Sequence, residues 1–117
     1  MALTNEGKKL AMEEGVLNGT RYISLHLSTG TELSGHGYAR KAITLNQWTV
    51  AANGQAVGPT ALDIYTANDG SAQDADQVAL YDASTGGNQI FTPETLTTDV
   101  GAPQNGQTFR LTLTLTP

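Results

Sequence analysis

The sequence predicts a mainly β fold class, an antiparallel β-sandwich or jelly-roll-like barrel with a short N-terminal helix, and three observations support it. Several short segments alternate apolar and polar residues with the period of two that is typical of strands. Dipeptides that tolerate a positive φ, such as "NG", "DG" and "GG", separate these segments. No segment between them has the length and periodicity of a crossover helix, which argues against a parallel sheet. We expect a single β-sandwich domain over residues 1–117.

Residues 1–17 are expected to form a short helix or arm, because apolar residues recur near helical spacing with charged residues around them. Thr4 or Asn5 is suited to cap the start of this helix, and Gly15 is suited to end it. A helix this short needs the rest of the domain to dock against. The apolar positions near helical spacing are Leu3, Leu10, Ala11 and Leu17.

Residues 21–27, "RYISLHL", are the first expected strand. Its isoleucine and leucines face one way, and its polar residues face the other, so we expect a half-buried strand. Ser24 and His26 lie on the polar face, which points to solvent or to a neighbouring subunit. Further strands are expected at 39–45, 47–52, 60–66, 77–82, 88–92 and 107–116.

The last of these strands has the clearest pattern. Its segment "TFRLTLTLT" places phenylalanine and leucines on one face and arginine and threonines on the other, and both sets favour strands. A strand of this kind is unsafe as a bare edge, because its free backbone groups would pair with other chains. The long polar segments 66–76 and 92–106 are expected to be loops that form contact surfaces.

Composition excludes several classes of function. The chain has no cysteine, which removes disulfides, thiolate nucleophiles and cysteine-based metal sites and suits folding in a reducing cytosol. The net charge of −5 and the scattered basic residues leave no surface for phosphates, so we expect no direct nucleic-acid partner. No apolar run approaches the roughly 18 residues of a membrane span, and no signal-peptide pattern is present, so we expect no membrane partner.

Candidate catalytic and metal-binding residues are few. His26 and His36 are the only histidines, and either is a candidate general base or metal ligand, although a structural role is the favoured interpretation for His26. Asp69, Asp74 and Asp76 form an acidic loop that matches the calcium-loop pattern poorly. We therefore expect neither a cofactor nor a bound metal.

The segment "SGHGYARKAI", residues 34–43, concentrates polar chemistry without a catalytic motif. "GHGYAR" lacks the third glycine of a dinucleotide fingerprint, and no serine has the spacing of a nucleophile elbow, so we expect no enzyme activity. The favoured interpretation is a shaped loop that enters a strand. Arg40 is the interactive residue, because its guanidinium suits a carboxylate such as that of Glu32 or Asp82, or one in a neighbouring subunit.

The order of these segments resembles that of small tailed-bacteriophage virion proteins of the tail-fibre or capsid-decoration type. The resemblance covers nearly the whole chain and includes "ALTNEGKKLAMEEGVL", "YISLHLSTG", "ELSGHGYARKAI", a lone tryptophan, "VALYDASTGGNQIF" and a threonine-rich last strand. Its most specific parts are "GYAR" at 37–40 and "ALYDASTGG" at 79–87. The resemblance implies a structural role in the virion and carries over no catalytic residues.

The first functional hypothesis is a capsid decoration, or cement, protein that is made in the host cytoplasm and stabilises the head shell. It would bind the major capsid protein on the virion head surface, as a homotrimer, and many copies would together oppose the pressure of packaged DNA. Interfaces favour tyrosine, tryptophan and arginine. The residues expected to act as interface or packing anchors are Tyr38, Arg40, Trp48 and Tyr81.

Two alternatives stay open. The first is a tail-fibre, tail-tip or head-fibre subunit that contacts the host surface through loops 66–76 and 92–106, with Tyr65 or Tyr81 stacking on a host-surface glycan. The second is a small cell-wall polysaccharide hydrolase, which would depend on His26 or His36.

Overall fold

Antiparallel pairing organises all the strands that the structure describes, which confirms the mainly β fold class with a short N-terminal helix. The structure is a computed structural model, and it describes residues 1–96 and 101–117. The strands are β1 (Arg21–His26), β2 (Lys41–Ile43), β3 (Thr49–Val50), β4 (Ala56–Val57), β5 (Leu62–Thr66), β6 (Gln77–Tyr81), β7 (Gln89–Thr95), β8 (Thr108–Leu111) and β9 (Thr114–Leu115).

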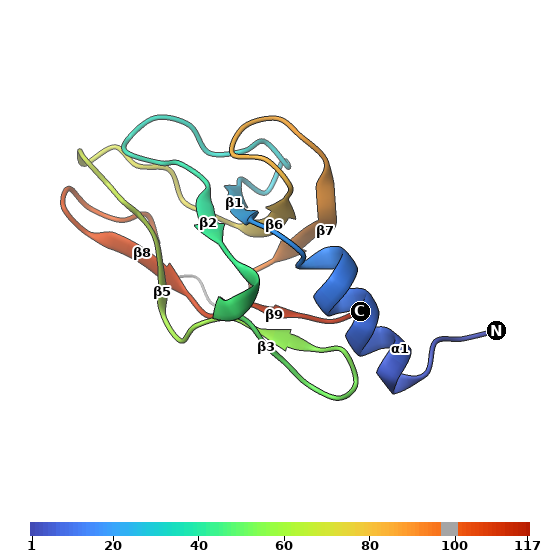
Figure 1. Ribbon diagram of the computed structural model, residues 1–117. Helices are drawn as coiled ribbons and strands as arrows, with labels where there is room; N and C mark the ends of the chain where they lie inside the picture. The colour runs from blue at the N-terminus through green and yellow to red at the C-terminus, as the bar shows by residue number, and fades with distance from the viewer. Residues whose placement is uncertain (97–100) are drawn as a thin grey trace.

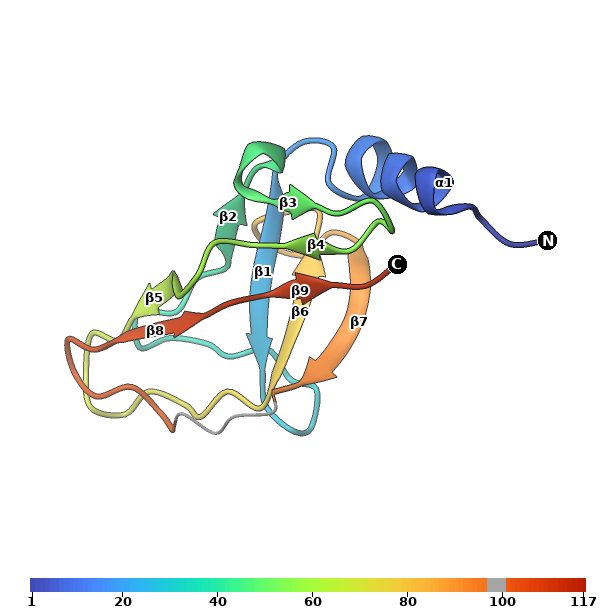
Figure 2. The same cartoon turned by 90° about the horizontal axis from the view of Figure 1, so that it is seen from below.

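The strands form two layers with the core between them. One layer is a four-stranded sheet in the order β2-β1-β6-β7, and the other contains the β3-β4-β9 sheet and the β5-β8 pair. Figure 2 shows β1 and β6 running across β4 and β9, as in an orthogonal sandwich. The buried side chains between the layers include Ile23, Leu25, Ile43, Ile64, Leu80, Phe109 and Leu115.

The strand expected at 107–116 is instead two strands, β8 and β9, that belong to different sheets. Their partners β5 and β4 follow the same order in reverse, so the four strands form one bent antiparallel ribbon. The break lies where Ala61 has a φ of +51° and its N–H donates to the Thr112 hydroxyl. The Thr112 hydroxyl and the Leu113 carbonyl therefore accept hydrogen bonds from the bend instead of continuing a regular β-ladder. The alternating sequence alone does not reveal this break.

The N-terminal helix is α1 (Asn5–Leu10), which continues into a π-helical segment, η1 (Ala11–Val16). Thr4 caps its start by accepting the Gly7 N–H at 3.0 Å, as the sequence predicted. Arg21 closes the other end, where its guanidinium donates to the carbonyl oxygens of Gly15 and Val16. A cation at this position also suits the negative end of the helix dipole.

The predicted apolar stripe of this helix is wrong at three of its four positions, because Leu3, Leu10 and Ala11 are all exposed. Leu3 and Leu10 are 61% and 48% exposed, whereas Met12 and Leu17 are buried. The cause is the π-helical turn, in which the Leu17 N–H donates to the Met12 carbonyl five residues earlier. This wider turn places Met12 and Leu17 on the same side, against the core. In a regular α-helix, residues five apart would not lie on the same side.

The first strand is buried on both faces, which corrects the half-buried strand that alternation predicted. Ser24 is fully buried and His26 is 3% exposed. The reason is that the chain after β1 turns back over this face, where the Gly30 carbonyl lies 3.0 Å from His26 Nδ1 and the Tyr81 ring stacks with the His26 ring.

The turn dipeptides confirm their expected role at the hairpins. "NG" at 53–54 closes the β3–β4 hairpin, and "GG" at 86–87 lies in the turn between β6 and β7. β7 extends to Thr95, so the loop expected at 92–106 begins later than predicted, and its residues 97–100 lie outside the described residues.

The molecule is elongated and measures 49 × 25 × 24 Å. Figure 1 shows α1 and the N-terminus at one side, the β3–β4 hairpin beside them, and the long loops along the other side. Within the described residues, no helix is long and apolar enough to cross a membrane.

Candidate interaction surface

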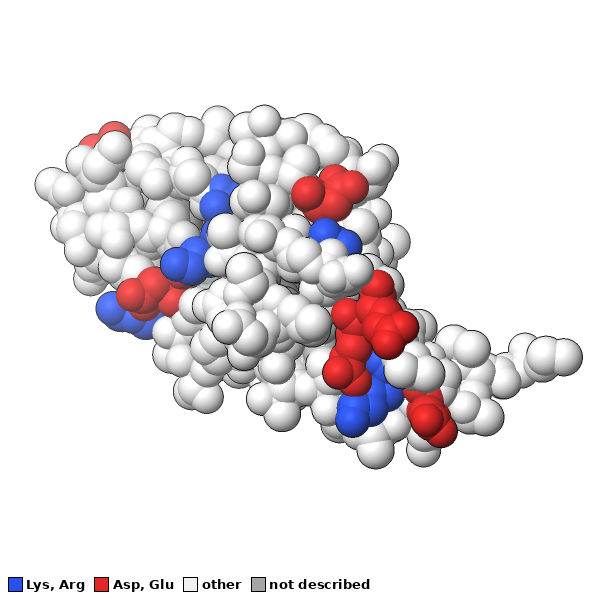
Figure 3. All heavy atoms as spheres, viewed as in Figure 1, with Lys and Arg blue, Asp and Glu red and all other residues white. Residues whose placement is uncertain are grey.

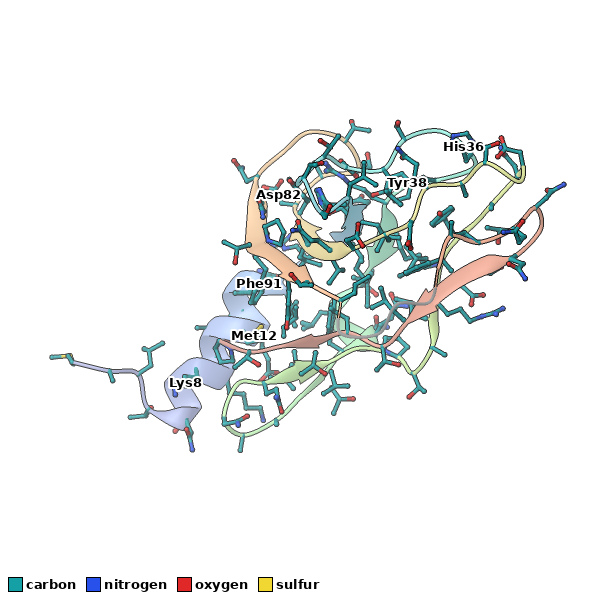
Figure 4. The ribbon with its side chains drawn as sticks, turned by 180° about the vertical axis from the view of Figure 1, so that it is seen from behind. Lys8, Met12, His36, Tyr38, Asp82 and Phe91 are labelled. Atoms are coloured by element: carbon teal, nitrogen blue, oxygen red, sulfur yellow. The ribbon has the colours of Figure 1, made fainter. Side chains whose placement is uncertain are left out.

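Three loops are joined by side-chain hydrogen bonds, and we call them together the loop surface. They are residues 27–40 between β1 and β2, residues 67–76 between β5 and β6, and residues 82–88 between β6 and β7. Two of them meet the four-stranded sheet where His26 pairs with Gln77, and the third leaves β6 at the opposite end, where Tyr81 pairs with Tyr22. Figure 4 shows Tyr38 between His36 on one side and Asp82 on the other, with Lys8 and Met12 on the helical side. Connections between strands of one rigid scaffold are suited to carry a binding site.

Arg40 is the centre of the loop surface. Its Nε and Nη2 donate to the two carboxylate oxygens of Glu32, at 2.9 and 2.8 Å, in a bidentate ion pair. Its Nη1 donates to the carbonyl oxygens of Ala83 and Gly86, at 2.9 and 2.8 Å. The Arg40 side chain is only 7% exposed. One guanidinium thus joins loop 27–40 to loop 82–88, and Glu32 is confirmed as its partner.

Tyr38 extends this network into the sheet. Its hydroxyl donates to Glu32 at 2.6 Å and accepts the Leu25 N–H at 3.1 Å, on the part of β1 that β2 does not reach. Hydrogen bonding from Arg40 holds the pKa of the Glu32 carboxyl below its ordinary value. Burial, together with the bond to Glu32, raises the pKa of Tyr38, so its phenol stays protonated and keeps donating.

The two tyrosines expected to stack on a sugar are already occupied. The Arg40 guanidinium carbon lies 4.0 Å from the ring centroid of Tyr81, and the His26 ring stacks with Tyr81 at 6.2 Å. Tyr65 is 7% exposed, and its ring packs between those of Tyr38 and Phe109. Both rings pack against side chains of the chain itself, but Tyr81 stays partly exposed, so stacking of a glycan on a tyrosine remains a prediction.

Loop 82–88 has its own internal bonds. The Asp82 carboxylate accepts the Asn88 N–H at 2.7 Å and the Asn88 side-chain amide at 3.0 Å, which lowers the pKa of Asp82. Gly87 has a φ of +75°, and a Cβ there would lie 2.6 Å from both Asp82 and Ala83. Asp82, the other carboxylate considered for Arg40, therefore closes its own turn instead.

His36 joins loop 27–40 to loop 67–76. Its Nδ1 lies 2.9 and 3.0 Å from the two carboxylate oxygens of Asp69, and this hydrogen bond lowers the pKa of Asp69. The Asn68 N–H donates to the His36 carbonyl at 3.1 Å. Gly35, His36 and Gly37 all have a positive φ, and a Cβ at Gly37 would clash with the Thr66 carbonyl. Backbone geometry therefore explains why this segment is rich in glycine.

The two histidines do not combine into a catalytic site. His26 Nε2 and the Ser24 hydroxyl form a hydrogen bond of 2.8 Å, but both side chains are buried away from any substrate. His36 is partly exposed, and its ring is paired with the Asp69 carboxylate rather than with a nucleophile. Asp76 accepts the Ser28 N–H at 3.1 Å and so points away from Asp69. Across the described residues, no three potential ligands gather to hold a metal ion.

Trp48 lies apart from the other three expected anchors. It is 7% exposed within the core, where its ring faces Gly58, and its Nε1 has no hydrogen-bond partner among the described residues. The structure thus brings Tyr38, Arg40 and Tyr81 together and leaves Trp48 in the other layer. Sequence reasoning considered His36 and Asp69 separately and missed that they pair, because 33 residues separate them along the chain.

Comparison with protein families gives one match. Residues 20–114 match the family model described as podophage GP4 fiber I protein gp80. The match begins just before β1 and ends in β9, so it includes the loop surface and excludes α1. The chain matches no curated protein sequence.

Proposed function

Because the chain belongs to the podophage GP4 fiber I protein gp80 family, which makes it a bacteriophage virion structural protein, we propose that it is a fibre subunit that contacts the host surface. The family description favours this function over the capsid-decoration function, since it names a fibre. The contact is made by binding, without breaking covalent bonds.

The observation that carries this proposal is the locking of three loops into one surface. Arg40 bonds loop 27–40 to loop 82–88, and the His36–Asp69 pair bonds loop 27–40 to loop 67–76. A further bond joins the Ser34 N–H to the Gln73 side chain at 3.0 Å. Loops held in one conformation lose little freedom when a ligand binds, so more of the contact energy becomes affinity.

The exposed side chains of the loop surface support a neutral polar ligand such as a host-surface glycan. Figure 3 shows charged side chains over the helical end and also across the middle and the lower left of this face, while the upper rim is mostly uncharged. Hydroxyl and amide groups are suited to hydrogen-bond sugar hydroxyls. The exposed neutral polar residues of these loops are Ser28, Thr29, Thr31, Ser34, Asn68, Ser71, Ser84, Thr85 and Asn88.

The test is competition for host adsorption. Purified protein should block adsorption of the phage to host cells, and Thr29→Lys with Ser84→Lys, both on exposed loop positions, should reduce this block at least tenfold. The matched control is Thr49→Lys on β3, an exposed threonine on the opposite side of the molecule, which should block as the wild type does. Equal blocking by all three proteins would contradict the proposal.

Two further measurements separate this function from the alternatives. Gold-labelled antibody should mark fibres on virions; label spread over the head shell would instead favour the capsid-decoration function. Incubation of the protein with host cell walls should release no soluble sugar, and release that His36→Ala abolishes would favour the hydrolase.

A further inference from the structure

The two layers of the sandwich leave an open seam between β7 and the β8–β9 ribbon. β7 is an edge strand of the four-stranded sheet, and β8 and β9 are edge strands of the other layer. Two adjoining depressions, of about 440 and 370 Å³, follow this seam and share Val78, Glu94, Leu113 and Thr114. They therefore form one groove, with β6 as its floor. Figure 4 shows Phe91 of β7 on this side of the molecule, between Asp82 and Met12.

The groove meets strand edges rather than strand faces. Side chains alternate between the two faces of a strand, so a face contributes every second residue to a groove. Here consecutive residues, 91–94 of β7 and 113–116 around β9, line the groove. The surface presented to the groove therefore includes backbone N–H and carbonyl groups on its two walls, the arrangement that accepts an added strand.

The two walls differ in how they are protected. β7 carries Pro93, which has no N–H to donate, and its pairing with β6 is irregular beside that residue. The ribbon at 108–116 contains no proline, glycine or lysine, and its one charged residue, Arg110, is paired with Asp63 at 2.5 Å. Edge strands of independent proteins are usually blunted by such residues. The β8–β9 edge is therefore the wall that is free to pair.

The chain offers a segment of matching length and pattern in residues 1–4, which we call the arm. Met1 and Leu3 are exposed and two residues apart, so in a strand they share one face, while Ala2 and Thr4 share the other. Thr4 already has extended backbone angles, φ −67° and ψ 167°. A strand of four residues spans about 13 Å, the same length as the groove wall at 113–116.

The arm is directed away from its own groove. Gly54 at the tip of the β3–β4 hairpin lies against the backbone of Lys8, where a Cβ would be 2.7 Å from the carbonyl carbon, so α1 is held in a fixed direction. Figures 1 and 2 both show the arm projecting beyond the body at the far end of α1. To reach its own groove the arm would have to unwind the helix that Thr4 caps.

We propose that the arm of one copy inserts into the groove of a second copy and pairs with its β8–β9 edge. Met1 and Leu3 then pack against the partly exposed Phe91 and Leu113 of the groove, and Ala2 and Thr4 share the outer face with Thr114 and its neighbouring threonines. The exchange covers the exposed apolar side chains of the arm and the bare edge in one contact. It joins copies of the chain whatever the ligand of the loop surface, and so does not rest on the proposed function.

Disulfide trapping between two copies tests this directly, because the chain has no cysteine of its own. Protein with Ala2→Cys is mixed with protein carrying Thr114→Cys or Thr116→Cys, the two positions covering neighbouring registers, and the mixture is oxidised. Residues opposite each other on paired strands lie within reach of a disulfide, so we expect a crosslinked heterodimer. Leu10→Cys, an exposed position on α1, is the matched control and should crosslink at least tenfold less.

The mass in solution provides the second measurement. The wild-type protein should sediment as an oligomer, Leu3→Asp should sediment as one chain, and Leu10→Asp should keep the oligomer, with all three giving the same far-ultraviolet circular dichroism. The proposal is overturned by a wild-type mass of one chain, by a Leu3→Asp variant that stays oligomeric, by equal crosslinking from Leu10→Cys, or by a disulfide that forms within one chain of the Ala2→Cys, Thr114→Cys double variant.

Discussion

At the scale of single residues, Arg40 shows how one side chain can organise several loops. Its planar guanidinium stacks on the Tyr81 ring. Its N–H groups donate to the Glu32 carboxylate and to the carbonyl oxygens of loop 82–88. Lysine would satisfy neither the bidentate geometry nor the stacking. The remaining members of the network, Tyr38 and Glu32, then have their hydrogen bonds determined by Arg40.

We predict that Arg40→Ala lowers the free energy of unfolding by about 3 kcal/mol, because it leaves Glu32 partly buried without its cation. Urea denaturation measures the loss. The matched control is Arg110→Ala, since Arg110 and Asp63 form an ion pair that is 56% and 60% exposed, and its loss should stay below about 1 kcal/mol. Equal losses in the two variants would mean that the Arg40 network is only a surface contact.

The Glu32 pKa predicts a dependence of stability on pH. The folded pKa lies below the ordinary value of 4.5, so in acid the unfolded state binds the proton more readily than the folded state. The stabilisation from Glu32 is thus complete above about pH 5 and is lost as pH falls through the folded pKa. Asp69 and Asp82 shift in the same direction, so the comparison must be made between variants.

Urea denaturation between pH 3 and pH 7 measures the free energy of unfolding of the wild type and of Glu32→Gln. We expect the difference in stability between the two proteins to be largest at neutral pH and to shrink toward pH 3, since only the wild type carries the charge that pairs with Arg40. A difference that stays constant across this range would contradict the assigned pKa direction.

At the scale of elements, close backbone contacts decide how the N-terminal helix is attached. The helix contributes only Met12 to the core from within its own span, and the β3–β4 hairpin supports it from the side through Gly54. The arm and α1 lie before the part of the chain that matches the family, whereas the strands and the loop surface lie within it. The helix is therefore an addition to the β-sandwich, held by few contacts.

We predict that Gly54→Ala destabilises the protein by about 2–4 kcal/mol and loosens α1, because a Cβ there would press into the Lys8 backbone. Gly106→Ala is the matched control: its φ of +83° is close to the +85° of Gly54, but no atom lies within 4 Å of the added Cβ. The control should cost only the strain of a positive φ, about 1–2 kcal/mol. Hydrogen exchange of the α1 amides should increase in Gly54→Ala alone; unchanged exchange would mean that the hairpin does not hold the helix.

At the scale of the whole molecule, the open seam and the projecting arm give the chain a shape suited to assembly. The layers cross over a shared core, and the bent β4–β5 and β8–β9 ribbon passes from one end of the molecule to the other. The loop surface consists of residues 27–40, 67–76 and 82–88, whereas the arm is residues 1–4 and the groove lies between β7 and the β8–β9 ribbon. A subunit with these separate surfaces can bind a ligand and join its neighbours at the same time.

The single domain expected from the sequence is itself a prediction that can be tested at this scale. Trp48 is the only tryptophan, and it is buried in the core, so its fluorescence reports on the packing between the layers. If the chain folds as one unit, the fluorescence and far-ultraviolet circular dichroism transitions in urea should coincide. Two separated transitions would show that the layers unfold independently.

The sequence by itself determined most of the strands, the hairpin turns and the helix cap, and it included Glu32 among the candidate partners of Arg40. These features depend on local periodicity and backbone preference, which neighbouring residues set. Only the tertiary structure decided that His26 is buried, that His36 meets Asp69, and that the last strand bends between two sheets. Each of these depends on segments far apart in the chain, because the face of a strand that is covered, and the edge that stays open, follow from how the layers pack.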